Sequence, residues 1–180
     1  HYVSRFNPAS LQLGERANVP GEPIAFDDGI LTLDDWQYTE GFGAERLLRT
    51  ARWDGGSGAE LVDTENLGSS YSTLVTGGGY VFSLGYDSSY RVNALQVTDS
   101  GDISKLAPLQ VSGWSSLLAA DADGTLYVYD NASLLTRYTA PGTWTVRDTT
   151  DLLQWPSGVR FGDTSAFLPL GYGGLAELDR

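Results

Sequence analysis

The 180-residue chain contains no cysteine and no methionine, and it has one histidine, His1, and one lysine, Lys105. The absence of thiols excludes disulfides, thiolate nucleophiles, zinc–thiolate sites and iron–sulfur clusters. With the only histidine at the start of the chain, a Ser-His-Asp triad and histidine-ligated metals are excluded as well. Any catalysis would rest on carboxylates, tyrosines or arginines, and we expect no cofactor and no metal.

The sequence also lacks long apolar runs and an excess of positive charge. No stretch approaches the roughly 20 apolar residues that span a bilayer, so we expect no membrane insertion. The 23 acidic and 11 basic residues give a net charge of −12, which repels phosphate backbones and argues against a nucleic-acid partner. An acidic chain with one lysine and no cysteine fits a secreted, periplasmic or cell-surface location. Because it starts at His1, we expect a mature product or an excised segment.

What the sequence does contain is one hairpin pattern repeated four times. Each copy has an apolar run, a tight turn and a second apolar run; the copies are "IAFDDGILTLDD" from residue 24, "TLVTGGGYVFSLG" from 73, "LLAADADGTLYVYDN" from 117 and "VRFGDTSAFLPLG" from 159. The turns fall at Gly29, Gly79, Gly124 and near Asp163, so the spacings are 50, 45 and about 40 residues. A recurring spacing of 40 to 50 residues predicts a repeat architecture.

Further strands are expected after each hairpin. Third strands are predicted at 45–53, 91–98, 133–140 and 174–180, and fourth strands at 59–67, 103–111 and 143–153. Four short strands per 40 to 50 residues are typical of β-propeller blades. We therefore predict an all-β propeller of about four blades, with a partial blade at 1–21, blades at 22–68, 69–111 and 112–153, and a partial blade at 154–180. The alternative is a two-sheet sandwich or a barrel.

The ends of the repeat leave two ways to close the ring. The terminal strands could share one blade and close a four-bladed ring, or the chain could be part of a larger propeller. We predict the second, because residues 174–180 still have the pattern of a strand. An open ring leaves sheet edges unpaired, so self-association through these edges is expected.

The third repeat also carries a family resemblance. The stretch "ADGTLYVYDNASLLTRYT" resembles blades of bacterial secreted or periplasmic β-propellers, including the repeats of pyrroloquinoline-quinone dehydrogenases. The shared pattern is Asp-Gly, an apolar-Tyr-apolar strand, a polar turn and the next strand. The Thr-Gly and Trp docking motif of those enzymes is absent. The resemblance therefore implies a fold and an extracytoplasmic setting, but no quinone chemistry.

The acidic turn of this repeat has the residue types of a calcium loop. Asp121, Asp123 and Asp130 would stand at positions three, five and twelve of such a loop, but its first position would be Ala119. The segment also has the pattern of a hairpin and not that of a helix–loop–helix unit. We interpret it as a plain turn.

Aromatic residues are concentrated in one class of predicted connections. The turns inside the hairpins, and those between third and fourth strands, are short, Gly-rich and acidic. The other connections are longer and hold the candidate partner-binding residues, namely Trp36, Tyr38, Tyr71, Tyr86, Tyr90 and Trp114. Aromatic side chains in the loops of a rigid scaffold indicate recognition. The alternative for these rings is packing between blades, which we favour for Trp114 and for Trp155. Binding and packing both stay open for Trp36, Tyr38, Tyr86 and Tyr90.

Three function classes are compatible with these features. The first is a non-catalytic recognition module that binds a protein or peptide through the aromatic connections. The second is a carbohydrate-binding or carboxylate-type glycosidase propeller, for which Asp35, Glu40, Asp87 and Asp130 are the available acids. The third, a cofactor-dependent dehydrogenase, lacks the docking motif. We favour the first class.

Overall fold

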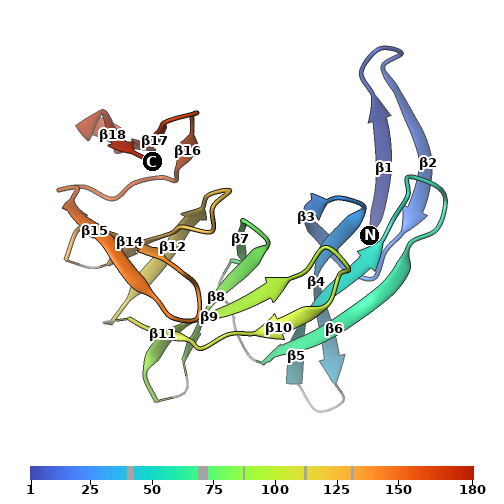
Figure 1. Ribbon diagram of the computed structural model, residues 1–180, viewed down its shortest axis with the longest axis horizontal. Helices are drawn as coiled ribbons and strands as arrows, with labels where there is room; N and C mark the ends of the chain where they lie inside the picture. The colour runs from blue at the N-terminus through green and yellow to red at the C-terminus, as the bar shows by residue number, and fades with distance from the viewer. Residues whose placement is uncertain (40–42, 69–72, 87, 112, 131) are drawn as a thin grey trace. The chain divides into compact units, whose positions relative to one another are not determined.

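The computed structural model of the chain describes every residue except 40–42, 69–72, 87, 112 and 131 (Figure 1). The described residues form strands, turns and one short 3-10 turn, η1 (Gly171–Gly173), with no α-helix among them. The prediction of an all-β chain is therefore confirmed. In this described part, no helix is long and apolar enough to cross a membrane.

The strands of the described residues form five sheets, which we letter A to E along the chain. Sheet A pairs β1 (Tyr2–Asn7) with β2 (Gln12–Asn18). Sheet B has the order β3 (Glu22–Asp27), β4 (Ile30–Thr39), β5 (Gly43–Arg52), β6 (Glu60–Gly68). Sheet C has the order β10 (Ile103–Lys105), β9 (Tyr90–Val97), β8 (Tyr80–Tyr86), β7 (Val75–Gly77), and β11 (Leu109–Gln110) also pairs with β9.

The remaining two sheets follow in the second half of the chain. Sheet D has the order β12 (Ser115–Ala120), β13 (Leu126–Asp130), β14 (Leu134–Thr139), β15 (Thr145–Asp151). Sheet E has three strands, β16 (Arg160–Phe161), β17 (Ser165–Pro169) and β18 (Leu175–Asp179). Every strand pair whose register is described is antiparallel.

The four repeated hairpins are present as strand pairs. They are β3–β4, β7–β8, β12–β13 and β16–β17. In the β3–β4 turn Asp28 and Gly29 have φ of 39° and 82°, and in the β7–β8 turn Gly78 and Gly79 have φ of 59° and 76°. Two successive positive φ values are the mark of the two-residue type I′ turn, whose twist matches that of the flanking strands. The Asp-Gly and Gly-Gly pairs are thus the local cause of these hairpins.

Two details of the strand prediction are wrong. The connection expected around residues 34–45 is largely strand, because β4 and β5 each run for 10 residues and stay paired as far as Thr39 and Gly43. The strand expected at 103–111 is divided into β10 and β11. Pro108 lies between these two strands, and a proline has no N–H to donate to a ladder.

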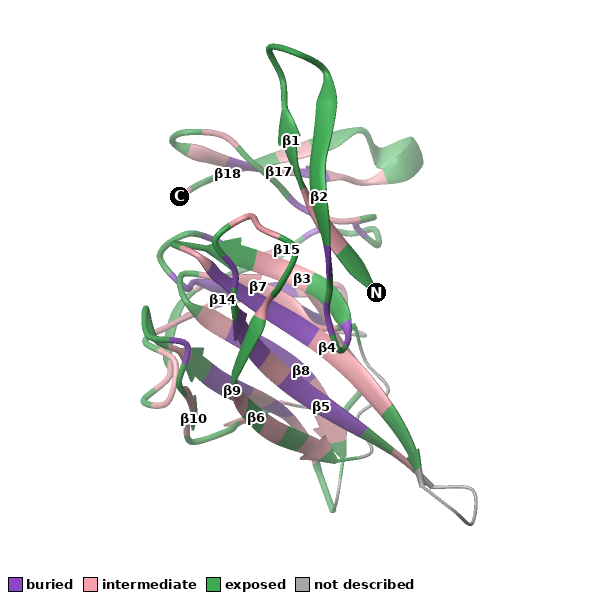
Figure 2. Ribbon diagram, turned by 90° about the vertical axis from the view of Figure 1, so that its right-hand side faces the viewer, coloured by how far each residue is buried: buried purple, intermediate pink, exposed green. Residues whose placement is uncertain are grey.

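The chain divides into two compact units, and each is described by itself. Unit 1 contains residues 1–70 and 96–104. Its core consists of Ala17, Val19, Leu31, Leu33, Ala51 and Trp53. Figure 2 shows that β4 and β5 carry buried segments, whereas the far half of the β1–β2 hairpin is exposed. The turn at 98–102 is fastened to sheet B, since Thr50 Oγ1 donates to Gly101 O at 2.5 Å and Ile103 N donates to Asp63 Oδ2 at 2.8 Å.

Unit 2 contains residues 71–95 and 105–180, and strand β13 lies at its centre. Leu126 and Val128 of β13 belong to a core cluster shared with Phe82, Val92 and Ala94 of sheet C. The alternate residues, Tyr127 and Tyr129, belong to a second cluster that includes residues of sheet E; its buried members from that sheet are Ala166 and Leu168. Because successive side chains of a strand point to opposite faces, sheet D is covered on both faces.

Two hairpin turns of unit 2 pack backbone to backbone. A Cβ built on Gly77 would lie 2.5 Å from Asp121 O, and one built on Gly78 would lie 2.5 Å from Gly124 N. The Asp121 turn is itself held by its carboxylate, whose Oδ1 accepts from Asp123 N at 3.0 Å and Thr125 N at 2.9 Å. Glycine is therefore required at 77 and 78 by close approach.

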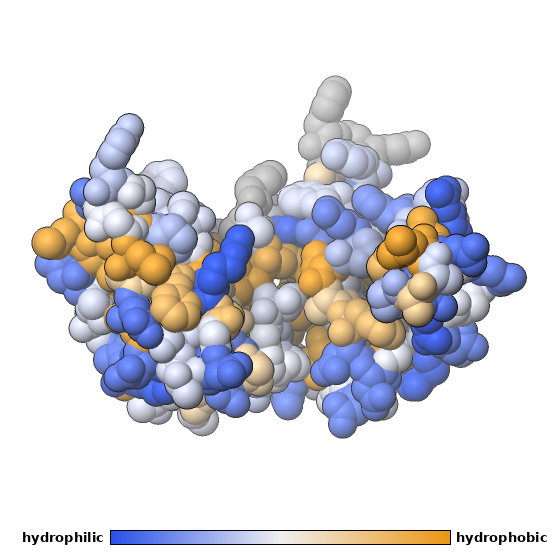
Figure 3. Space-filling view, turned by 90° about the horizontal axis from the view of Figure 1, so that it is seen from above, coloured by the Kyte–Doolittle hydropathy of each residue, from blue (hydrophilic) through white to orange (hydrophobic). Residues whose placement is uncertain are grey.

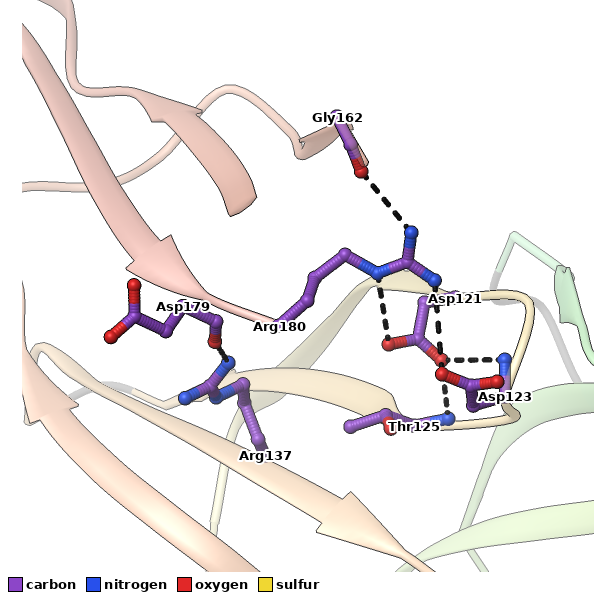
Figure 4. Close-up of polar contacts among 7 residues, drawn as sticks. All are labelled: Asp121, Asp123, Thr125, Arg137, Gly162, Asp179 and Arg180. Atoms are coloured by element: carbon purple, nitrogen blue, oxygen red, sulfur yellow. Dashed lines mark hydrogen bonds and ion pairs between the residues drawn. The ribbon is translucent and has the colours of Figure 1, made fainter. Parts of the chain in front are cut away.

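Two arginines join sheet E to sheet D (Figure 4). Arg180 Nε lies 3.8 Å from Oδ2 of the buried Asp121, and its NH1 donates to Gly162 O at 3.2 Å. Arg137 donates through NH1 to the carbonyl of Asp179, and its Nε donates to Asp148 Oδ1 at 2.6 Å. Hydrogen bonding to Asp148 raises the pKa of Arg137 above its ordinary value. Each of the two contacts between sheets D and E therefore involves a charged guanidinium group, that of Arg137 or that of Arg180.

Candidate functional site

Three of the six candidate binding residues come together as one ring cluster. The rings of Tyr86 and Tyr90 have centroids 4.8 Å apart, and those of Tyr90 and Trp114 are 5.9 Å apart, with interplanar angles of 52° and 40°. Tyr86 is 66% exposed and Trp114 is 71% exposed, whereas Tyr90 between them is partly buried. We call Tyr86, Tyr90 and Trp114 the ring cluster.

The strands of sheet C position the ring cluster. Tyr86 is the last residue of β8 and Tyr90 is the first residue of β9, so the hairpin connection places their rings side by side. Trp114 is brought to Tyr90 by β11, because β11 pairs with β9 and Val111 N then donates to Tyr90 O at 3.2 Å. Ser89 Oγ also donates to Gln110 Oε1 at 2.9 Å. Two connections distant in sequence therefore present one aromatic surface.

The other candidate residues are not in this cluster. Trp36 and Tyr38 lie on strand β4 in unit 1, so their expected placement in a loop is wrong. The guanidinium of the buried Arg46 lies 5.0 Å from the centre of the Trp36 ring, which gives this ring a packing role. Tyr38 is 85% exposed. Tyr71 lies outside the described residues.

Trp155 occupies a position comparable to that of Trp114, shortly before the first strand of the next sheet. Its ring meets that of the buried Tyr129 edge to face, with centroids 4.7 Å apart, and the side chain is 56% exposed. Contact with a core residue agrees with the packing alternative for this tryptophan. Trp114, in contrast, contacts the partly buried Tyr90.

Exposed apolar side chains also occur elsewhere, as the orange regions of Figure 3 illustrate. Single exposed apolar residues are normal on protein surfaces, and only contiguous groups are informative. In the ring cluster three aromatic side chains are in contact while two of them stay more than half exposed.

The candidate carboxylates have structural roles where they are described. Asp35 Oδ2 accepts from Arg49 Nε at 2.9 Å. Asp130 Oδ1 accepts from the backbone N–H groups of Ala132 and Leu134 at 2.9 and 3.0 Å. Glu40 and Asp87 lie outside the described residues. Asp35 and Asp130 are therefore held in place by an ion pair and a turn, and they belong to different units.

The carboxylate of the acidic turn at Asp121 also has a structural role. The Asp121 carboxylate accepts from the backbone of its own turn and faces Arg180, which is the arrangement of a plain hairpin turn. Among the residues that the structure describes, no group of three or more His, Asp or Glu side chains could hold a metal ion.

The Arg137 and Arg180 junction of sheets D and E was not anticipated from the sequence. Its only sequence signal is that an arginine occurs in or directly after each predicted third strand, a pattern that also suits solvated edges.

In comparisons with known proteins, no family model and no curated protein sequence matched the chain.

Proposed function

We propose that the chain is part of a β-propeller that serves as a non-catalytic recognition module outside the cytoplasm, and that it binds a protein or peptide partner through the ring cluster. The observation that carries the binding site is the contact among Tyr86, Tyr90 and Trp114 at an exposed surface. Tyr and Trp side chains offer a large apolar area, few rotatable bonds that become ordered on binding, and a polar group for orientation. Such residues dominate the binding energy of protein interfaces.

The propeller part of the proposal is supported by repetition and by face-to-face packing. Sheets B and D each have four antiparallel strands in chain order. Sheet D shares one core cluster with sheet C and another with sheet E, as consecutive blades would. The resemblance of residues 122–139 to bacterial propeller blades and the acidic composition with no cysteine support a secreted, periplasmic or cell-surface setting.

The non-catalytic part is supported by the environment of the acids. A glycosidase needs two carboxyl groups about 5 to 9.5 Å apart across the substrate. Asp35 is paired with Arg49, and Asp130 accepts two backbone hydrogen bonds. Carbohydrate binding without hydrolysis is the second candidate, and it is favoured by one observation: sugars stack on exposed rings such as that of Trp114.

Replacing Trp114 with alanine is expected to weaken partner binding at least about tenfold, the usual effect of losing an aromatic anchor. The probe is a synthetic peptide selected with the intact protein from a phage-displayed random library, and binding is measured by calorimetry. Cellohexaose and chitohexaose are titrated in parallel. The thermal transition should hardly move, because Trp114 is mostly exposed.

The matched control is Tyr172→Ala, since Tyr172 is fully exposed and lies outside the ring cluster. It should change peptide binding less than twofold. If the hexasaccharides bind through Trp114 and no peptide does, the carbohydrate alternative replaces the proposal. If Trp114→Ala leaves peptide binding unchanged, the ring cluster is not the binding site.

A further inference from the structure

The three rings of the ring cluster are unevenly exposed. Tyr86 and Trp114 are 66% and 71% exposed, whereas Tyr90, whose ring contacts both of theirs, is partly buried. The middle ring therefore lies deeper than the two rings that flank it. We call this arrangement the trough, with Tyr90 as its floor and the other two rings as its walls.

The ring planes of the trough are tilted relative to one another. The interplanar angles are 52° for Tyr86 and Tyr90 and 40° for Tyr90 and Trp114, and the ring centres are 4.8 and 5.9 Å apart. Tilted rings in contact form a ridged surface and not a flat platform. Because a sugar stacks its face on a flat platform, this geometry favours a narrower ligand.

The trough also carries hydrogen-bond donors that are not used inside the fold. No other residue in the described part of the chain pairs with the indole N–H of Trp114 or with the hydroxyl groups of Tyr86 and Tyr90. The polar side chains beside the trough bond to each other, since Ser89 Oγ donates to Gln110 Oε1 at 2.9 Å. A ligand that fits these donors presents acceptors that its own structure leaves free.

A proline-rich segment in the polyproline II conformation has these properties. This helix has no internal hydrogen bonds, so its carbonyl groups are free to accept, and proline has no N–H that binding would leave unpaired. Its rise of about 3.1 Å per residue places residues two apart about 6 Å from each other, which is close to the spacing of neighbouring rings in the trough. An α-helix, in contrast, uses its carbonyl groups internally.

The charge near the trough favours a basic ligand. Ser115, the residue after Trp114, is paired with Asp130 across the β12–β13 ladder, so an acidic residue lies close to this wall of the trough. Arg91 follows Tyr90 on β9 and points to the opposite face of that strand, because successive side chains alternate. The whole chain has a net charge of −12. Basic residues next to the prolines are therefore complementary to this surface.

We propose that the ring cluster binds a proline-rich segment of a partner protein, in the polyproline II conformation and with basic residues beside the prolines. This inference rests on the proposed function, because it names the partner of the same site. Pyrrolidine rings pack in the trough between Tyr86 and Trp114, and the indole N–H of Trp114 donates to a carbonyl of the segment. A ligand that is already stiff loses little conformational freedom on binding.

The probe is a synthetic peptide of eight L-prolines with an arginine at each end, titrated into the protein by calorimetry. Its matched control contains D-prolines instead, which keeps the composition and charge but reverses the hand of the helix. A second control replaces the prolines with alternating glycine and serine, which gives a flexible coil. The L-proline peptide should bind at least about tenfold more tightly than either control.

Variants of the trough locate the contact. Trp114→Phe keeps a ring in the wall but removes the indole N–H, and it should weaken binding of the L-proline peptide at least about threefold. Trp114→Ala removes the ring as well and should weaken binding at least about tenfold. Tyr38→Ala is the matched control, since Tyr38 is 85% exposed and belongs to the other unit; it should change binding less than twofold. Unchanged binding in Trp114→Ala overturns the proposal.

The remaining outcomes separate this inference from the proposed function. If a library-selected peptide without proline binds through Trp114 and the L-proline peptide does not bind, the ring cluster is a peptide site of another kind, and only the proline proposal is wrong. Equal binding of the L-proline and D-proline peptides indicates apolar adsorption and also overturns it. If a hexasaccharide binds through Trp114 and no peptide does, both the inference and the proposed function fail.

Discussion

Replacing Arg137 with alanine should lower the free energy of unfolding by about 1.5–3 kcal/mol, the range for losing hydrogen bonds to a charged group, because the Asp148 side chain is 38% exposed and water can replace part of what it loses. Arg137 is 5% exposed, and it donates to both oxygens of Asp148 and to the carbonyl of Asp179. Its guanidinium also lies 5.8 Å from the centre of the Tyr127 ring. Truncation leaves the Asp148 carboxylate without its partner and opens the junction of sheets D and E.

Arg147→Ala is the control for this prediction. Arg147 lies on the neighbouring strand β15 and is exposed, so its loss should change stability by no more than about 0.5 kcal/mol. Arg137→Lys keeps the charge but loses the two-pronged contact with Asp148, and it should fall between the other two variants. Urea unfolding followed by circular dichroism measures all three. Equal midpoints for Arg137→Ala and Arg147→Ala would contradict the assigned role of the junction.

The second large effect is expected for Gly78→Ala. The new methyl would lie 2.5 Å from Gly124 N, and forcing the two turns apart should cost about 1–3 kcal/mol. Gly78 also has a φ of 59°, and an L side chain in this left-handed region costs roughly a further 1–2 kcal/mol. The turn at Asp121 cannot yield easily, because its carboxylate ties it to Asp123 and Thr125.

Gly171→Ala separates the two causes. Gly171 also has a φ of 59°, but a Cβ there would meet nothing within 4 Å. This variant should therefore lose only the conformational part, and Gly78→Ala should unfold at a lower urea concentration. If the two variants unfold together, the packing of the β7–β8 turn on the β12–β13 turn does not contribute to stability.

The strands were predictable because their signals are local. Type I′ turns need positive φ at two successive residues, and the sequence supplies Asp-Gly and Gly-Gly at the two places where the structure has them. Alternating apolar runs on either side then define the strands. The same reasoning misplaced Trp36 and Tyr38, because long paired strands and long loops can share one composition, and only the pairing of β4 with β5 decides between them.

The site was predictable only in part, because its geometry depends on contacts between distant segments. The pattern of aromatic connections gave Tyr86, Tyr90 and Trp114 as candidates together with three residues outside the ring cluster, and nothing local shows that β11 brings Trp114 to Tyr90. Likewise, the junction made by Arg137 and Arg180 depends on sheet E lying on sheet D. An arginine in a strand has the same sequence pattern whether its partner is water or a buried carboxylate.

The central claim is that partner binding occurs at the ring cluster, and the indole N–H signals of the five tryptophans test it in one nuclear magnetic resonance titration. Trp53 donates its indole N–H to Gly56 O at 2.9 Å and Trp144 donates to Ala107 O at 2.7 Å, so both indole N–H groups are already hydrogen-bonded within the protein. On adding the selected peptide, the Trp114 signal should shift progressively to saturation while those of Trp53 and Trp144 stay in place. A saturating titration in which the Trp114 signal does not move would contradict the claim.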